Sequence, residues 1–175
     1  MSNPAGSRPV RAESIPRDGI ITGLLGAGVV ALFYLAVDAT RGHPLMTPSV
    51  LGQAFVLHQP VTLTSPDTTA VIAYTIFHVL AFVVFGFVLA ALVRASEASN
   101  LARYAMVQVL VAFMVLFYGV VSIGSEIVRG MLPFASVLIA NALAGAVMGG
   151  WLWRHHPQLR LLFAQTTLGT SDGRA

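Results

Sequence analysis

Long runs of apolar residues, separated by short polar segments, set the pattern of this chain. Each of the long runs approaches or exceeds the roughly 20 residues that a helix needs to cross the hydrocarbon core of a bilayer. We therefore predict an all-α membrane protein, a four-transmembrane-helix up-down bundle whose transmembrane domain covers residues 19–154. The predicted spans are residues 19–38, 70–94, 102–128 and 134–153.

Polar segments flank these runs and interrupt them once at length. Residues 1–18 are polar and rich in proline, so we expect a disordered tail there, and residues 155–175 form a second polar tail. In the long outer loop, Thr47 suits a helix N-cap and Pro48 suits the first helical position. The stretch that follows predicts a helix over about 48–58. It is too short to span, so we expect an interfacial or re-entrant helix.

The basic residues predict the orientation of the bundle. All of them are arginine, a usage typical of GC-rich bacterial genomes. If the N-terminus is cytoplasmic, only Arg41 and Arg129 lie on the outer side, and the other arginines lie on the inner side. Because cytoplasmic segments carry an excess of basic residues, we expect a multi-pass protein of the inner membrane with both termini cytoplasmic.

The overall composition excludes several classes of protein. Charged residues make up 10% of the chain, whereas a soluble domain carries about 25%. The chain has no cysteine, which excludes disulfides, thiolate metal sites and cysteine nucleophiles. The arginines are dispersed and form no basic stripe with interleaved aromatic residues, so we expect no nucleic-acid partner. The lipid bilayer is the partner that this composition predicts.

The candidate chemistry centres on His78, which lies inside the second predicted span. Tyr74 lies one helical turn before it, and an ionisable side chain inside a membrane is costly enough to indicate a function. With both termini inside, Asp38 and Glu126 fall in the same outer half of the membrane. One hypothesis is a ligand or metal site of His78, Glu126 and Asp38, helped by His58 from the outer loop. Imidazole and carboxylate groups suit zinc, manganese or iron.

A structural interpretation explains the same residues without a ligand. His78 would then be hydrogen-bonded across helices, while Asp38 and Glu126 pair with Arg41 and Arg129 at the water interface. Haem is a further alternative, but it needs two axial ligands, and only His78 is well inside a span. We predict no cofactor, with haem or a divalent metal as the alternatives.

Small residues predict how the spans pack. Gly23 lies in the first span, and Gly145 and Gly149 are four residues apart in the last one. Small residues at this spacing let transmembrane helices approach closely. Nucleophilic catalysis has no comparable pattern, since the G-x-S-x-G elbow is missing, so we expect no enzyme and no catalytic residue.

Two stretches resemble a group of uncharacterised four-span bacterial integral membrane proteins. These stretches are RGHPLMTPSVLGQAF at Arg41–Phe55 and YTIFHVLAF at Tyr74–Phe82. The resemblance implies the four-helix architecture and no particular activity.

The sequence favours a structural or accessory subunit of a membrane assembly, with other membrane proteins as partners or as a homo-oligomer. Two alternatives stay open. One is a small transporter or a metal- or ligand-binding membrane protein with its site around His78. The other is a haem- or quinone-binding electron-transfer subunit.

Overall fold

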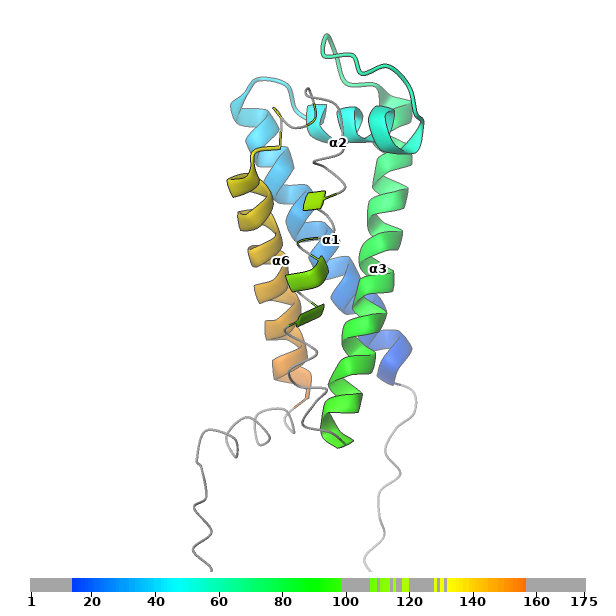
Figure 1. Cartoon of the computed structure of the whole chain (residues 1–175), viewed down its shortest axis with the longest axis vertical. Helices are drawn as coiled ribbons and strands as arrows, with labels where there is room; N and C mark the ends of the chain where they lie inside the picture. The colour runs from blue at the N-terminus through cyan, green and yellow to red at the C-terminus, as the bar shows by residue number, and fades with distance from the viewer. Residues whose placement is uncertain are drawn as a thin grey trace, which may run out of the picture.

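A computed structural model describes residues 14–98 and 132–156, together with isolated positions between 108 and 130. Helices account for all of the regular structure in these residues, as an all-α fold requires. In chain order they are α1 (Ser14–Thr40), α2 (Met46–Leu51), the π-helical turn η1 (Gly52–Val56), α3 (Thr68–Ala98) and α6 (Phe134–His155) (Figure 1).

Three of these helices, α1, α3 and α6, are long and apolar enough to cross a membrane. They coincide with the spans predicted at 19–38, 70–94 and 134–153, and each helix extends beyond the predicted bounds. Helical hydrogen bonding does not stop where hydropathy falls, so polar residues such as Arg17 and Glu97 continue their helices. The predicted span 102–128 lies largely outside the described residues, as do most of the two predicted tails.

Contacts between the long helices reveal their relative directions. His78 of α3 reaches Ala27 near the middle of α1, and the start of α3 lies at the same end of the bundle as the end of α1. The last described residue, His156, contacts Asp18 near the start of α1. Both α3 and α6 are therefore antiparallel to α1, which makes them parallel to each other (Figure 1).

Glycines bring α1 and α3 into backbone contact at the end where α1 begins. A Cβ atom added to Gly23 would lie 2.5 Å from the Phe82 carbonyl oxygen and from the Val83 Cα. A Cβ atom at Gly86 would in turn meet the backbone of Gly19 and Gly23. Since no side chain larger than hydrogen fits here, these glycines fix the point at which the two helices cross.

Away from this crossing, α1 and α3 diverge toward the other end of the bundle (Figure 1). Helix α1 ends there in a Schellman motif: the Gly42 N–H donates to the Ala39 carbonyl, and the His43 N–H donates to the Asp38 carbonyl. Gly42 has a φ of 77°, which glycine adopts without steric cost. The diverging helices α1 and α3 form a wedge, and the chain then turns back across its wide end.

The segment that crosses this end, residues 46–57, is called the capping segment below. It was predicted as one helix over 48–58, but it begins at Met46 and divides into α2 and η1. Thr47 is not its N-cap, because the position before the helix is Leu45 with a φ of 69°. The N–H and hydroxyl of Thr47 instead donate to Asp38, so a side chain of α1 satisfies the first turn of α2.

A buried amide fastens the capping segment to the start of α3. The Gln53 side chain donates to the Ser49 hydroxyl at 3.0 Å and accepts from the Thr62 N–H at 2.8 Å. The Ser49 hydroxyl also accepts from the Asp67 N–H at 2.8 Å. Asp67 in turn caps α3 by accepting from the Ala70 N–H at 3.0 Å. The capping segment and the first turn of α3 therefore form one hydrogen-bonded unit.

Candidate functional site

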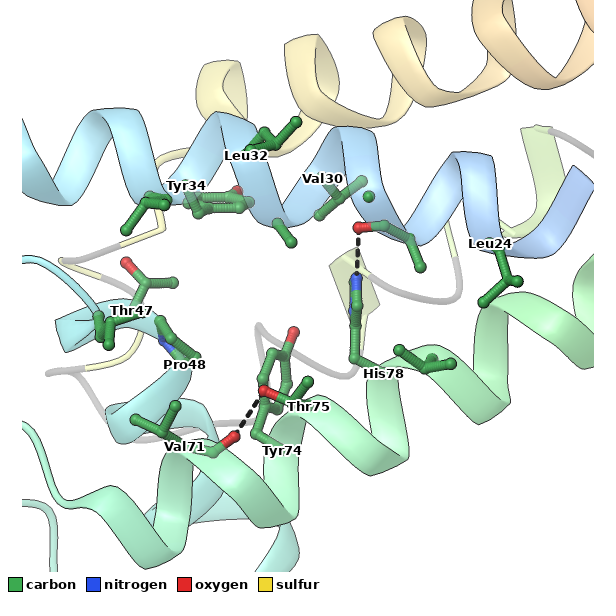
Figure 2. A pocket seen from close by; sticks show the side chains of 16 residues that line it. Leu24, Val30, Leu32, Tyr34, Thr47, Pro48, Val71, Tyr74, Thr75 and His78 are labelled. Atoms are coloured by element: carbon green, nitrogen blue, oxygen red, sulfur yellow. Dashed lines mark hydrogen bonds between the residues drawn. The ribbon is translucent and has the colours of Figure 1, made fainter. Parts of the chain in front are cut away.

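A cavity of about 340 Å³ lies in the wedge between α1 and α3 (Figure 2). One wall comes from α1 and the other from α3, while Leu45, Thr47 and Pro48 close the capped end. This volume falls at the lower end of the range for small-molecule sites, roughly 300–1,000 Å³. The cavity therefore exists because glycines close the wedge at one end and the capping segment covers it at the other.

The walls are apolar except for a few hydroxyl groups and one imidazole. The Thr47 hydroxyl is engaged with Asp38, and the Thr75 hydroxyl donates to the Val71 carbonyl. The polar groups left for a ligand are the phenol groups of Tyr34 and Tyr74 and the ring of His78. None of the lining residues that the structure describes has an aspartate, glutamate, lysine or arginine side chain.

His78 joins the two walls of the cavity. Its ring is 8% exposed, and Nε2 lies 3.3 Å from the backbone carbonyl oxygen of Ala27 on α1. A carbonyl can only accept, so Nε2 carries the hydrogen in this contact and Nδ1 is the acceptor of the neutral ring. The ring stacks on Tyr74 with centroids 5.5 Å apart, and its centroid lies 4.8 Å from that of Phe82.

Tyr34 supplies a buried hydroxyl from α1. The side chain is 8% exposed, and its oxygen has no hydrogen-bond partner of standard geometry in the described structure, although the Ser136 side chain lies close to it. Figure 2 shows the hydroxyl of Tyr74 pointing from α3 toward α1. Tyr34 and Tyr74 both line the space that His78 also borders. A buried hydroxyl without a partner is costly, which makes this group available to a bound molecule.

The structure brings two of the predicted site residues together and separates others. His78 and Tyr74 share the cavity. Asp38 is 1% exposed and is held by Thr47 outside the cavity lining. His58 is exposed in the loop after the capping segment, with a φ of 53°, and does not line the cavity. Glu126 lies outside the described residues.

No metal cluster forms within the part of the chain that the structure describes, which holds no group of three or more suitable histidine, aspartate or glutamate side chains. Because Glu126 is not among those residues, the predicted site of His78, Glu126 and Asp38 stays a prediction. The described residues around His78 form a cavity lined by aromatic and aliphatic side chains without charge.

The three predicted packing glycines have different surroundings. Gly23 is buried at the crossing with α3. Gly145 is half-buried and lines a second, smaller space beside Phe85 and Phe113. Gly149 is exposed, and a Cβ atom there would meet nothing within 4 Å in the described structure. Other residues form the buried face of α6, namely Val137, Ala140, Ala144, Met148 and Leu152.

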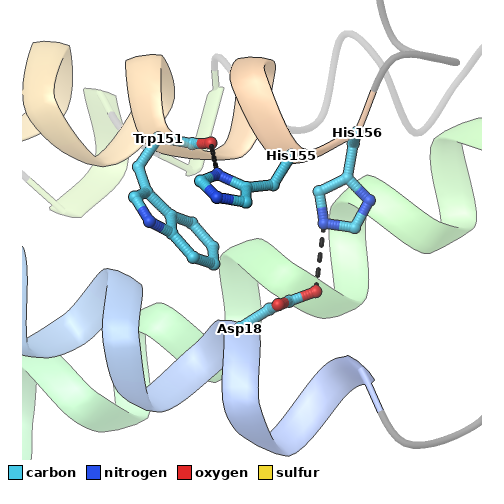
Figure 3. Close-up of polar contacts among 4 residues, drawn as sticks. All are labelled: Asp18, Trp151, His155 and His156. Atoms are coloured by element: carbon cyan, nitrogen blue, oxygen red, sulfur yellow. Dashed lines mark hydrogen bonds and ion pairs between the residues drawn. The ribbon is translucent and has the colours of Figure 1, made fainter.

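Sequence reasoning missed a polar contact at the opposite end of the bundle. His156 Nε2 lies 3.0 Å from Asp18 Oδ2, joining the end of α6 to the start of α1 (Figure 3). The neighbouring His155 donates within its own helix, from Nδ1 to the Trp151 carbonyl oxygen at 2.8 Å, and its ring stacks on the Trp151 indole. Asp18 and His156 are far apart in sequence, so no local pattern predicts their contact.

Comparison with protein-family models finds no match, and neither curated proteins nor solved structures give one. The resemblance to four-span bacterial membrane proteins therefore stays a prediction.

Proposed function

We propose that this chain is a four-span protein of the bacterial inner membrane that binds a neutral lipophilic molecule in the cavity between α1 and α3. The observation that carries the proposal is the cavity itself, whose described lining is uncharged, includes His78 and two tyrosines, and has exposed leucines at its rim. It refines the hypothesis of a ligand site around His78.

The directions of the helices support a fourth span. Helices α3 and α6 are parallel, so the chain between Ala98 and Leu132 has to return from one end of the bundle to the other. A helix as long as α6, with 22 residues, covers about 33 Å, roughly the thickness of the hydrocarbon core. The apolar run predicted as a span at 102–128 supplies such a crossing.

The distribution of charge supports the proposed orientation. Arg17, Arg94 and Arg154 belong to the helix ends that lie with Asp18, whereas Arg41 follows α1 at the capped end. An excess of arginine marks the cytoplasmic side, so the capping segment and the cavity below it belong to the outer half of the membrane.

The exposed rim of the cavity supports a ligand that arrives from the bilayer. Leu24, Leu32 and Leu35 line it and are 50%, 67% and 40% exposed. In a membrane these side chains contact acyl chains, so the gap between α1 and α3 opens to lipid. The described lining residues include no charged side chain. This favours a neutral ligand, because a buried ion without a partner is strongly disfavoured.

An accessory subunit without chemistry of its own, the function that the sequence favours first, explains the apolar surface equally well. It leaves the cavity and the buried Tyr34 hydroxyl without a role. Binding of a lipophile accounts for both, and a binding protein can still act as part of a larger assembly.

The test is native mass spectrometry of the full chain released from lipid nanodiscs. We expect the wild-type protein to carry the added mass of a bound neutral molecule. Ala31→Phe should lose this mass, because the phenylalanine ring enters the cavity. Ala146→Phe is the matched control, because Ala146 is an exposed position of α6 outside the cavity. No bound mass, or a mass retained equally in both variants, would overturn the proposal.

A further inference from the structure

We infer that the ligand of this cavity carries a planar ring with carbonyl or hydroxyl oxygens as its head group, joined to an apolar tail, as in a lipid-soluble quinone or its quinol. This inference rests on the proposed function and names the ligand class. The hydrogen-bonding groups, the aromatic rings and the rim of the cavity support it.

The polar groups of the cavity match an oxygen on an uncharged ring. The phenol groups of Tyr34 and Tyr74 can each donate to a carbonyl oxygen. The same groups, together with the second nitrogen of the His78 ring, can accept from a hydroxyl. The site therefore serves both the keto and the hydroxyl form of one head group. Among the described residues it offers no charged partner to a phosphate or an ammonium group.

The aromatic side chains of α3 favour a flat head group. Tyr74, His78 and Phe82 follow one another at intervals of four residues, so their rings form a column along the helix. Tyr74 and His78 both border the cavity. A planar ring gains contact with such surfaces, because aromatic pairs contribute attraction beyond the area that they bury.

The size and opening of the site fit a head group with a tail. A cavity of about 340 Å³ encloses a substituted ring and the first part of a chain. The remainder of the tail leaves between the exposed side chains of Leu24 and Leu32 and continues among the lipids. This arrangement places the oxygen atoms inside the bundle and the flexible tail outside it.

The experiment compares probes that share a decyl tail: decyl-1,4-benzoquinone, decylbenzene and decanol. Binding to the full chain in nanodiscs is measured by isothermal titration calorimetry, with empty nanodiscs subtracted. We expect the quinone to bind about 10-fold more tightly than either other probe, because decylbenzene lacks the acceptors and decanol lacks the ring.

Two variants test whether the hydroxyl groups of Tyr34 and Tyr74 cause the preference for the quinone. Tyr34→Phe and Tyr74→Phe should each weaken quinone binding about 3- to 10-fold and leave decylbenzene binding unchanged. Tyr118→Phe is the matched control, since Tyr118 lies outside the cavity lining and packs on Phe134. Phenylalanine keeps the ring, so a loss in the two cavity variants reports the hydroxyl and not the packing.

The outcomes separate this inference from the function on which it rests. If decanol or decylbenzene binds as tightly as the quinone, or if neither cavity variant changes the preference, the ring-and-oxygen head group is wrong although a lipophile binds. If none of the probes binds and native mass spectrometry finds no bound mass, the proposed function itself is wrong.

Discussion

The carboxylate of Asp38, in the last turn of α1, holds the first turn of α2 through Thr47. One oxygen accepts from the Thr47 backbone N–H and the other from its hydroxyl, each at 2.6 Å. Asp38 is 1% exposed and Thr47 is 2% exposed. A charge-assisted contact between buried groups thus connects α1 to a capping segment whose other polar contacts lead to α3.

Replacing this acceptor should destabilise the protein. Asp38→Asn removes the negative charge and one of the two acceptor oxygens, so the contact is no longer charge-assisted and the Thr47 hydroxyl has to turn to accept from the new NH₂ group. We expect a loss of about 1–3 kcal/mol in the free energy of unfolding, measured by reversible unfolding in mixed micelles. Thr47→Ser keeps both donors and should stay close to wild type. Equal stability of Asp38→Asn and wild type would contradict the proposed role of the carboxylate.

The same contact should control access to the cavity from the capped end. The chain contains no cysteine, so a single Val71→Cys thiol in the cavity wall can be labelled cleanly with a water-soluble maleimide. We expect slow labelling in the otherwise unchanged protein and faster labelling when Thr47→Val is added. Leu63→Cys, at a position 48% exposed in the loop, provides the accessible control. Identical rates with and without Thr47→Val would exclude a covering role.

The glycine crossing should tolerate no side chain. Gly23→Ala places a methyl group 2.5 Å from the backbone of α3, so the two helices have to separate. We expect a loss of about 1–3 kcal/mol in the unfolding free energy, typical of overpacking. Gly149→Ala is the matched control, because its methyl group meets nothing in the described structure and alanine favours a helix. The prediction fails if both variants unfold alike.

Removing the imidazole should affect binding more than assembly. His78→Ala deletes one hydrogen bond to α1 and the ring that stacks on Tyr74. We expect loss of the bound lipophile with expression in the membrane close to wild type, compared by native mass spectrometry and immunoblotting. If His78→Ala instead prevents stable insertion and no ligand is found on the wild-type protein, His78 is a packing residue.

The amide of Gln53 should stabilise the whole outer loop. Gln53→Leu leaves the Thr62 N–H without its acceptor and removes the donor to Ser49. We expect faster proteolysis within residues 58–66 and a loss of about 1–3 kcal/mol. Gln59→Leu, at an exposed position, should behave as wild type. Unchanged proteolysis of Gln53→Leu would show that the loop is held by packing alone.

The sequence predicts the positions of the helices in this protein better than it predicts the contacts between them. Apolar length alone locates α1, α3 and α6, and His78 is conspicuous because it interrupts such a run. Local signals also exist for the ends of the elements, since Gly42 terminates α1 and Asp67 caps α3. These features depend on near neighbours in the chain, and a sequence shows near neighbours directly.

The partners of the polar side chains could not be predicted in the same way. The spans are apolar on all sides, so periodicity does not mark which face points inward. Tyr34 and Tyr74 therefore line one cavity only because Gly23 and Gly86 set the rotation and crossing of their helices. Thr47 resembled an N-cap of its own helix, yet a carboxylate from α1 accepts its hydrogens. Such pairings follow from the packing of distant segments.

The glycine crossing also has a mechanical consequence. Between Gly86 and Thr68 lies about 27 Å of helix, which acts as a lever arm with its pivot at the crossing. A tilt of about 5° around that pivot displaces the far end by about 2 Å, and it displaces His78, about 12 Å from the pivot, by about 1 Å. Substitutions at the pivot should therefore change the width of an opening several helical turns away.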